Sequence, residues 1–150
     1  MKREYPNQPI VGVGAVIIRD GRILLARRGS EPGKNRWSIP GGLVELGETV
    51  RSTIVREVKE ESSLDVEVHS LIDVVDNLVP DKKGRLRYHF IILDFFTTLK
   101  SGTPRAGSDA LDVRWVPFED VDGYDLTKTF RGFFERNKER LKHFDSTKKP

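Results

Sequence analysis

Hydrophobic residues along this chain form short runs rich in Val and Ile, together with two segments of helical periodicity. The first run covers residues 10–18, and a second covers residues 22–28 after the dipeptide Asp20-Gly21. An Asp-Gly pair between two apolar runs is a strong signal for a two-residue hairpin turn. The pattern therefore predicts a β-hairpin near the start of the chain, followed by a Gly- and Pro-containing loop over residues 29–35.

The second half of the chain repeats this pattern of strands and ends in a helix. Partial alternation predicts a strand over 65–76, and Pro80 with its charged neighbours predicts a turn over 77–83. The apolar residues 90–93 lie in the middle of a predicted strand over 85–99, as is typical of a central strand covered on both faces. Further predictions are a strand over 113–116, a helical turn over 118–121 and a helix over 127–143 that turns Phe130, Phe133, Phe134 and Leu141 to the core.

The other periodic segment predicts a helix over about 49–62. At about 100° per residue, Ile54, Val55 and Val58 form one apolar arc with Val50 at its edge. Glu57 and Glu61 fall beside that arc, so we expect both side chains to be partly covered. A covered carboxylate needs a partner.

Three carboxylates, Glu57, Glu60 and Glu61, lie within five positions of this helix. Residues three or four apart are neighbours on a helix, and like charges there repel by a few tenths of a kcal/mol per pair. A divalent cation removes that repulsion, and hard oxygen ligands of this kind suit Mg²⁺ or Mn²⁺. The turn Pro40-Gly41-Gly42 before the helix lets the backbone approach a ligand closely. The alternative interpretation is a solvated acidic face on a surface helix.

The spacing of these residues decides between the two interpretations. Gly42 is followed after five residues by Glu48, and after seven more by the segment Arg56-Glu57-Val58-Lys59-Glu60-Glu61 and then Leu64. This pattern resembles the signature of the Nudix hydrolases at every defining position except one, where Ser63 stands in place of a Gly. Gly past a helix end supplies a left-handed backbone conformation, and Ser there costs on the order of 1 kcal/mol. The departure adds no charge and removes no ligand.

The resemblance covers about residues 9–142 and implies a fold and a chemistry. The fold is an α/β (α+β) sandwich with α/β/α layers and a mixed sheet. The activity is hydrolysis of a pyrophosphate linkage in a nucleoside diphosphate joined to another group, with Mg²⁺ or Mn²⁺. Carried over by position, the metal ligands are Glu57, Glu60, Glu61 and the carbonyl of Gly41, while Glu48 and Arg56 brace the loop against the helix.

Residues outside the signature are candidates for the rest of the site. Arg27, Arg28 and Arg36 can clamp phosphate oxygens, because a guanidinium matches that geometry, although each can equally be a surface charge. A general base is needed, and Asp109 lies where some relatives place a late-loop carboxylate. Asp112 is the alternative, and either can be a turn-forming residue.

Substrate choice rests on weaker signals. Pro80 follows Leu64 by sixteen residues, a spacing that resembles the ADP-ribose pyrophosphatase group, so we expect ADP-ribose to be split to AMP and ribose 5-phosphate. The alternatives are a pyrophosphatase of nucleoside triphosphates such as 8-oxo-dGTP, an enzyme for other sugar nucleotides or dinucleotides, and a sensor that binds without cleaving. All three signature carboxylates are present, which favours an enzyme.

Length and composition predict the number of domains, the kinds of partner and the location of the protein. A length of 150 residues predicts a single domain over 1–150, with a C-terminal tail over 145–150. A formal net charge of +3 is too small to favour nucleic acid as a partner. The absence of Cys excludes disulfide and thiol chemistry, and without a signal peptide or long apolar run we expect a cytoplasmic protein with no membrane partner. The resemblance is compatible with a homodimer.

Overall fold

The structure, a computed structural model, describes residues 2–107 and 109–144. The predicted tail over 145–150 lies outside these residues. Strands and helices follow one another as β1 (Ile10–Arg19), β2 (Arg22–Arg28), β3 (Trp37–Ser38), β4 (Gly41–Leu43), α1 (Val50–Ser62), β5 (Asp65–Pro80), β6 (Leu86–Ser101), β7 (Ala110–Pro117), a 3₁₀ helix (Phe118–Gly123) and α2 (Lys128–Leu141).

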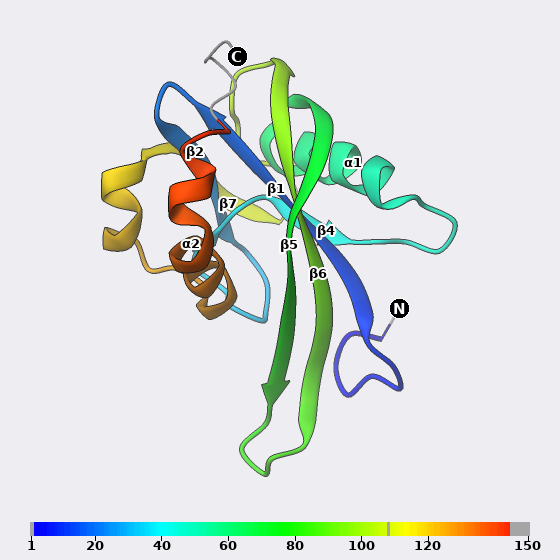
Figure 1. Ribbon diagram of the computed structural model, residues 1–150. Coiled ribbons are helices and arrows are strands. Elements are labelled where there is room, and N and C mark those ends of the chain that lie inside the picture. Colours follow the sequence, from blue (N-terminus) through cyan, green and yellow to red (C-terminus); the bar gives the residue numbers. More distant parts are fainter. Residues whose placement is uncertain (1, 108, 145–150) are drawn as a thin grey trace.

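The strands of the described residues form one seven-stranded mixed sheet. Its main path runs β3-β2-β1-β6-β5, while β4 pairs with β1 and β7 pairs with β2. The β1–β6 pair is parallel and the other pairs are antiparallel. Helix α1 covers one face, and α2 with the 3₁₀ helix covers the other (Figure 1). The predicted α/β/α sandwich with a mixed sheet is confirmed.

Strand β1 is buried on both faces and separates two apolar cores. Val13, Ala15 and Ile17 pack with Ile54 and Val58 of α1. Val16 and Ile18, which alternate with them, belong to the core beneath α2 that also holds Phe130, Phe133, Phe134 and Leu141. Because successive side chains of a strand point to opposite faces, one Val- and Ile-rich segment supplies both layers.

The predicted hairpin turn at Asp20-Gly21 is present, with positive φ angles of 53° and 72°. The turn predicted over 77–83 begins too early, because β5 continues to Pro80 and pairs there with Leu86. An edge strand tolerates Pro, since its outer N–H needs no partner. The chain then turns around Asp81, whose Oδ1 accepts the backbone N–H groups of Lys83 and Arg85, each at 2.9 Å.

Strand β6 lies inside the sheet as expected, but its apolar middle is not fully covered. Phe90 is buried, whereas Ile91, Ile92 and Leu93 are only partly buried. The β5–β6 hairpin extends beyond the two helices, so neither helix covers its far end (Figure 1). The expectation of a strand covered on both faces is therefore wrong for this stretch.

Helix α1 starts and packs largely as its sequence predicts. The N-cap residue Thr49 accepts the Ser52 N–H through its hydroxyl at 3.1 Å, which satisfies one of the free donors of the first turn. Ile54 and Val58 are buried, but Val55 is 41% exposed, which contradicts its place in the predicted arc. The small residues Thr53 and Ser62 complete the buried face instead, because they fit where the helix lies close to the sheet and the preceding loop.

Ser63 ends α1 in the left-handed conformation, with φ 66° and ψ 12°. Its N–H donates to the Lys59 carbonyl at 3.0 Å, and its hydroxyl donates to the Arg105 carbonyl at 3.3 Å. The sequence therefore places a residue with a Cβ at a position that favours glycine.

Replacing Ser63 with Gly tests this strain. We expect Ser63→Gly to raise the free energy of unfolding by about 1 kcal/mol, because glycine adopts positive φ without steric cost. Urea denaturation measures the change. Ser70→Gly is the control, because Ser70 is an exposed residue of β5 at which glycine relieves no strain. A destabilised Ser63→Gly protein would mean that the hydroxyl contact with Arg105 outweighs the strain.

Candidate active site

A cavity of about 450 Å³ lies where β1, β4 and α1 meet the β5–β6 hairpin and the loop after β2. One end is acidic and includes Glu57, Glu60 and Glu61 of α1 beside Gly41 and Gly42. The other end is largely apolar and includes residues of the hairpin and of β4, namely Leu43, Leu78, Val79, Pro80, Phe90 and Ile92. Such a cavity suits an elongated ligand with a charged and an apolar part.

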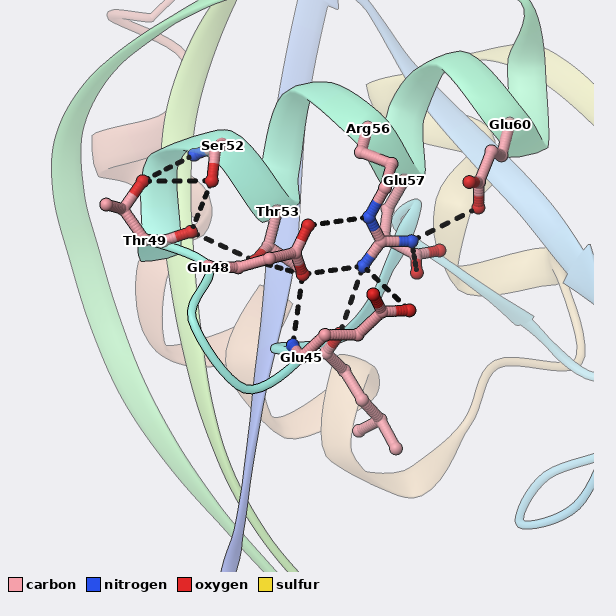
Figure 2. A network of polar contacts seen from close by, with 9 residues as sticks. Glu45, Glu48, Thr49, Ser52, Thr53, Arg56, Glu57 and Glu60 are labelled. Carbon is pink, nitrogen blue, oxygen red and sulfur yellow. Dashed lines mark hydrogen bonds and ion pairs between the residues drawn. The ribbon is translucent and has the colours of Figure 1, made fainter. Parts of the chain in front are cut away.

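Arg56 is the centre of the polar network at the acidic end (Figure 2). Its Nε and Nη2 donate to the two carboxylate oxygens of Glu48 at 2.7 and 2.8 Å, a bidentate pair. Nη1 donates to Glu57 at 2.9 Å and to Glu60 at 3.3 Å, and Nη2 also reaches the Leu43 carbonyl at 3.3 Å. One guanidinium thus ties the loop before α1 to two of the three signature carboxylates.

Glu48 holds the loop on its other side. Its Oε1 accepts the backbone N–H of Glu45 and the hydroxyl of Thr53, each at 3.0 Å. The hydrogen bond from Arg56 is the main reason that the pKa of Glu48 falls to about 2, and the Glu45 N–H adds to the effect. Glu48 therefore stays ionised at all but very acidic pH.

Burial raises the pKa of Glu57 and Glu61, which line the cavity, whereas the pKa of Glu48 is lowered. Burial raises the pKa of Glu61 to about 8, although the Gly41 N–H donates to its Oε2 at 2.8 Å and opposes the shift. Burial also raises the pKa of Glu57, against the lowering effect of Arg56. Carboxylates held close together in a partly dry site favour either a proton or a cation.

Two glycines make this arrangement possible. A Cβ at Gly42 would overlap the carboxylate of Glu57, and a Cβ at Gly41 would overlap the Val13 carbonyl. The Gly-Gly pair lets the β4 backbone lie directly against the Glu57 side chain on one side and β1 on the other. The sequence predicts close backbone approach to a ligand at this turn, and here the closely approached groups are the Glu57 carboxylate and the Val13 carbonyl.

The donor set fits a divalent ion in charge and chemistry. Within the described ranges, no three His, Asp or Glu side chains are already gathered as a ligand set, because Glu57 and Glu60 turn to Arg56 while Glu61 accepts the Gly41 N–H. All three nonetheless line one end of one cavity. Oxygen donors with net negative charge are what Mg²⁺ and Mn²⁺ select.

Of the three candidate arginines, Arg28 and Arg36 line the cavity, and Arg27 does not. Arg28 donates from Nε to the Pro32 carbonyl at 2.8 Å, and Arg36 lies 3.8 Å from a carboxylate oxygen of Asp125. Arg27 instead donates to the Asn35 carbonyl at 3.1 Å on the exposed surface.

Of the two candidate general bases, only Asp109 lines the cavity. Asp109 is exposed at the rim and lines the cavity. Its charge raises the pKa of Glu61, which places it near the acidic end. Asp112 does not line the cavity and accepts a hydrogen bond from Arg114 at 2.9 Å.

Sequence reasoning missed several residues that line the cavity. Arg3 and the segment 127–129 at the start of α2 contribute to its wall. Asp94 of β6 also lines it and is 4% exposed. Burial raises the pKa of Asp94 to about 7, and the charge of Asp73 adds to the shift. The available signal was a single carboxylate inside the apolar stretch 90–96.

Comparison with known proteins identifies the family. A sequence model of the NUDIX domain matches residues 8–137. This chain belongs to the Nudix family. The acidic helix and the Gly-Gly turn form the acidic end of the cavity. The Nudix domain, together with relatives named as pyrophosphatases and diphosphatases, indicates a hydrolase that acts on pyrophosphate bonds.

Individual Nudix proteins are similar over most of the chain. An ADP-ribose pyrophosphatase of Methanocaldococcus jannaschii is 38% identical over 75% of this chain and 64% of its own length. A Mycobacterium tuberculosis protein named "Putative 8-oxo-dGTP diphosphatase 2" is 33% identical over 80% of this chain and 89% of its own length. The crystal structure of a MutT NUDIX hydrolase from Burkholderia pseudomallei has a TM-score of 0.76 and 34% identity, covering 86% of this chain and 98% of that one.

In residues 2–107 and 109–144, no helix combines the length and the apolar character that crossing a bilayer requires.

The pKa of Glu48 leads to a testable pH dependence. Because the folded-state pKa lies below the ordinary 4.5, Glu48 stabilises the fold above pH 4.5, and this contribution is lost as the pH falls toward 2. We expect Glu48→Gln to lower the thermal midpoint at pH 7, and the difference from the wild type to shrink below pH 4.5.

Scanning calorimetry between pH 7 and pH 3 measures this difference. Glu67→Gln, an exposed residue of β5 outside the Arg56 network, controls for the loss of one negative charge. A difference for Glu48→Gln that is equally large at pH 7 and pH 3 would contradict an ionic origin.

Proposed function

We propose that this Nudix protein hydrolyses ADP-ribose to AMP and ribose 5-phosphate with a divalent metal ion. The observation that carries the proposal is that Pro80 lines the same cavity as Glu57, Glu60 and Glu61. The sequence mark of the ADP-ribose group therefore lies where a substrate can touch it. The name of the archaeal relative, an ADP-ribose pyrophosphatase, supports the same substrate.

The signature residues have definite tasks in this mechanism. Glu57, Glu60 and Glu61 would hold the ion together with the Gly41 carbonyl, and Glu48 and Arg56 keep the loop and helix in register. A bound divalent ion neutralises pyrophosphate charge and lowers the pKa of a coordinated water.

The remaining residues bind the substrate and accept a proton. Arg28 and Arg36 bind phosphate oxygens from the loop side of the cavity. Asp109 accepts the proton of the attacking water. The water oxygen bonds to one phosphorus, the bond from that phosphorus to the bridging oxygen breaks, and the other phosphate leaves with that oxygen.

A second candidate function is pyrophosphate release from nucleoside triphosphates. It is favoured by the Mycobacterium tuberculosis relative, whose name refers to 8-oxo-dGTP and of which the match covers 89%. Both functions use the same acidic end, so only the products separate them.

A substrate panel tests the proposal directly. We expect AMP and ribose 5-phosphate from ADP-ribose in Mg²⁺ or Mn²⁺, and no product in EDTA. The panel also contains NADH, diadenosine polyphosphates, dNTPs and 8-oxo-dGTP, and chromatography identifies the products. Faster release of pyrophosphate from the triphosphates would replace ADP-ribose with the second function. Tight binding of ADP-ribose without turnover of any compound would favour a sensor.

Paired substitutions test the assigned residues. We expect Glu61→Gln to lower kcat on the order of 100-fold or more, because it removes a charged metal ligand. We expect Asp109→Asn to lower kcat by more than about 3-fold, since general-base loss costs more than that. Asp112→Asn is the matched control and should remain near wild type. Steady-state kinetics with saturating Mg²⁺ gives these values, and an Asp109→Asn enzyme within about 3-fold would exclude Asp109 as the base.

A further inference from the structure

Asp94 is a buried carboxylate that the hydrolytic mechanism does not use. It lies in the interior of β6, in register with Gly14 of β1 on one side and Asp73 of β5 on the other. A Cβ at position 14 would overlap its carboxylate, so glycine makes the room that this side chain occupies. Asp94 is only 4% exposed, and it lines the cavity.

No hydrogen bond or ion pair from the described residues satisfies this carboxylate. The nearby donors are engaged elsewhere, since Arg136 and Asn137 both donate to Asp73, at 3.2 and 3.0 Å. The space over Gly14 is shared with the side chain of Ile39, and Ile92 lies two residues earlier on the same face of β6 and lines the same cavity. A buried carboxylate without a partner is costly, and proteins retain such groups mainly where a ligand completes them.

The exposed oxygen of Asp94 is directed to the cavity. Among the described residues, every side-chain oxygen or nitrogen that is fully shielded from solvent has a hydrogen-bond partner. The carboxylate of Asp94 has none, so it keeps contact with the cavity space. A ligand in that space can therefore reach it.

The Asp94 carboxylate lies near the Gly-Gly turn at the acidic end of the cavity. Gly41, Gly14 and Asp94 lie side by side on β4, β1 and β6. Neighbouring strands are about 4.8 Å apart, but the Asp94 carboxylate reaches back over Gly14, so it lies nearer to Gly41 than the two strand spacings between their backbones. A ligand bound at the acidic end can therefore reach this carboxylate with the part that extends along the sheet.

The chemistry around Asp94 selects among the parts of a nucleotide. A phosphate would be repelled by the carboxylate, and a ribose with several hydroxyls needs more partners than this apolar wall provides. A nucleobase has flat apolar faces that suit Phe90 and Ile92, and N–H donors at its edge that suit a single acceptor.

We propose that Asp94 is a specificity-determining residue whose carboxylate accepts a hydrogen bond from an N–H group at the edge of the substrate's nucleobase. The identity of that base rests on the proposed function: for ADP-ribose the donor is the 6-amino group of adenine. A site built around a buried acceptor rejects a ligand that lacks the donor, because the acceptor is then left unpaired.

The test compares ADP-ribose with its analogue that carries hydrogen in place of the 6-amino group. We expect the wild type to prefer ADP-ribose by about 10- to 100-fold in kcat/KM, mostly through KM. Asp94→Leu should reduce this preference to about 1 while leaving kcat within a few fold. Asp94→Asn keeps an acceptor oxygen of similar shape and should retain part of the preference.

Two controls separate recognition from folding. Asp76→Leu changes an exposed carboxylate on the neighbouring strand that does not line the cavity, so it should keep the full preference. Thermal midpoints show whether each variant is folded, and Asp94→Asn serves if Asp94→Leu is not. A variant of Asp94 that slows both substrates equally would overturn the inference and leave a structural role.

The role of Asp94 can be tested even if ADP-ribose is not the substrate. If the wild type does not cleave ADP-ribose, calorimetric binding of AMP and GMP, each compared with purine riboside 5′-monophosphate, tests Asp94 alone. Tighter wild-type binding of AMP or GMP that is lost in Asp94→Leu would support the inference with another substrate. Equal binding of all three nucleotides by the wild type would overturn it.

Discussion

The arrangement of the acidic end depends on the bidentate contact between Arg56 and Glu48. Through it, one guanidinium connects the loop over residues 44–49 to α1 and neutralises part of the charge on Glu57 and Glu60. Without a cation at this point, three carboxylates within five positions would repel one another and the helix would lose part of its stability. The pair therefore does more than a surface salt bridge, because it sets the position of side chains that belong to the site.

The two ends of the cavity come from different parts of the chain. The acidic end is built from the continuous segment 41–61, with Gly41, Gly42 and the three glutamates. The apolar end is built from the β5–β6 hairpin, in which Pro80 and Phe90 face the same space as Asp94. The acidic and the apolar residues thus occupy separate ends of one cavity. Relatives in the same family carry names with different substrates.

Sequence reasoning succeeded where local rules decide the structure. The Asp20-Gly21 turn and the helix over about residues 49–62 each follow from preferences of neighbouring residues. It failed where contacts between distant segments decide. The exposure of Val55 depends on how α1 lies on the sheet, and the extension of β5 to Pro80 depends on pairing with β6. Asp94 cannot be recognised as a cavity residue from the sequence, because its environment depends on the pairing of β6 with Gly14 of β1.

The parallel pairing of β1 with β6 has a consequence for how the protein folds. Ile10 pairs with Phe90 and Ile17 with Thr97, so the partners are separated by more than half of the chain. Closing so long a loop costs entropy before any contact repays it, which makes such pairings late events in folding. The Gly-Gly turn with the acidic helix and the β5–β6 hairpin with Asp94 are each close in sequence and can form early, whereas the cavity between them exists only after β1 has paired with β6.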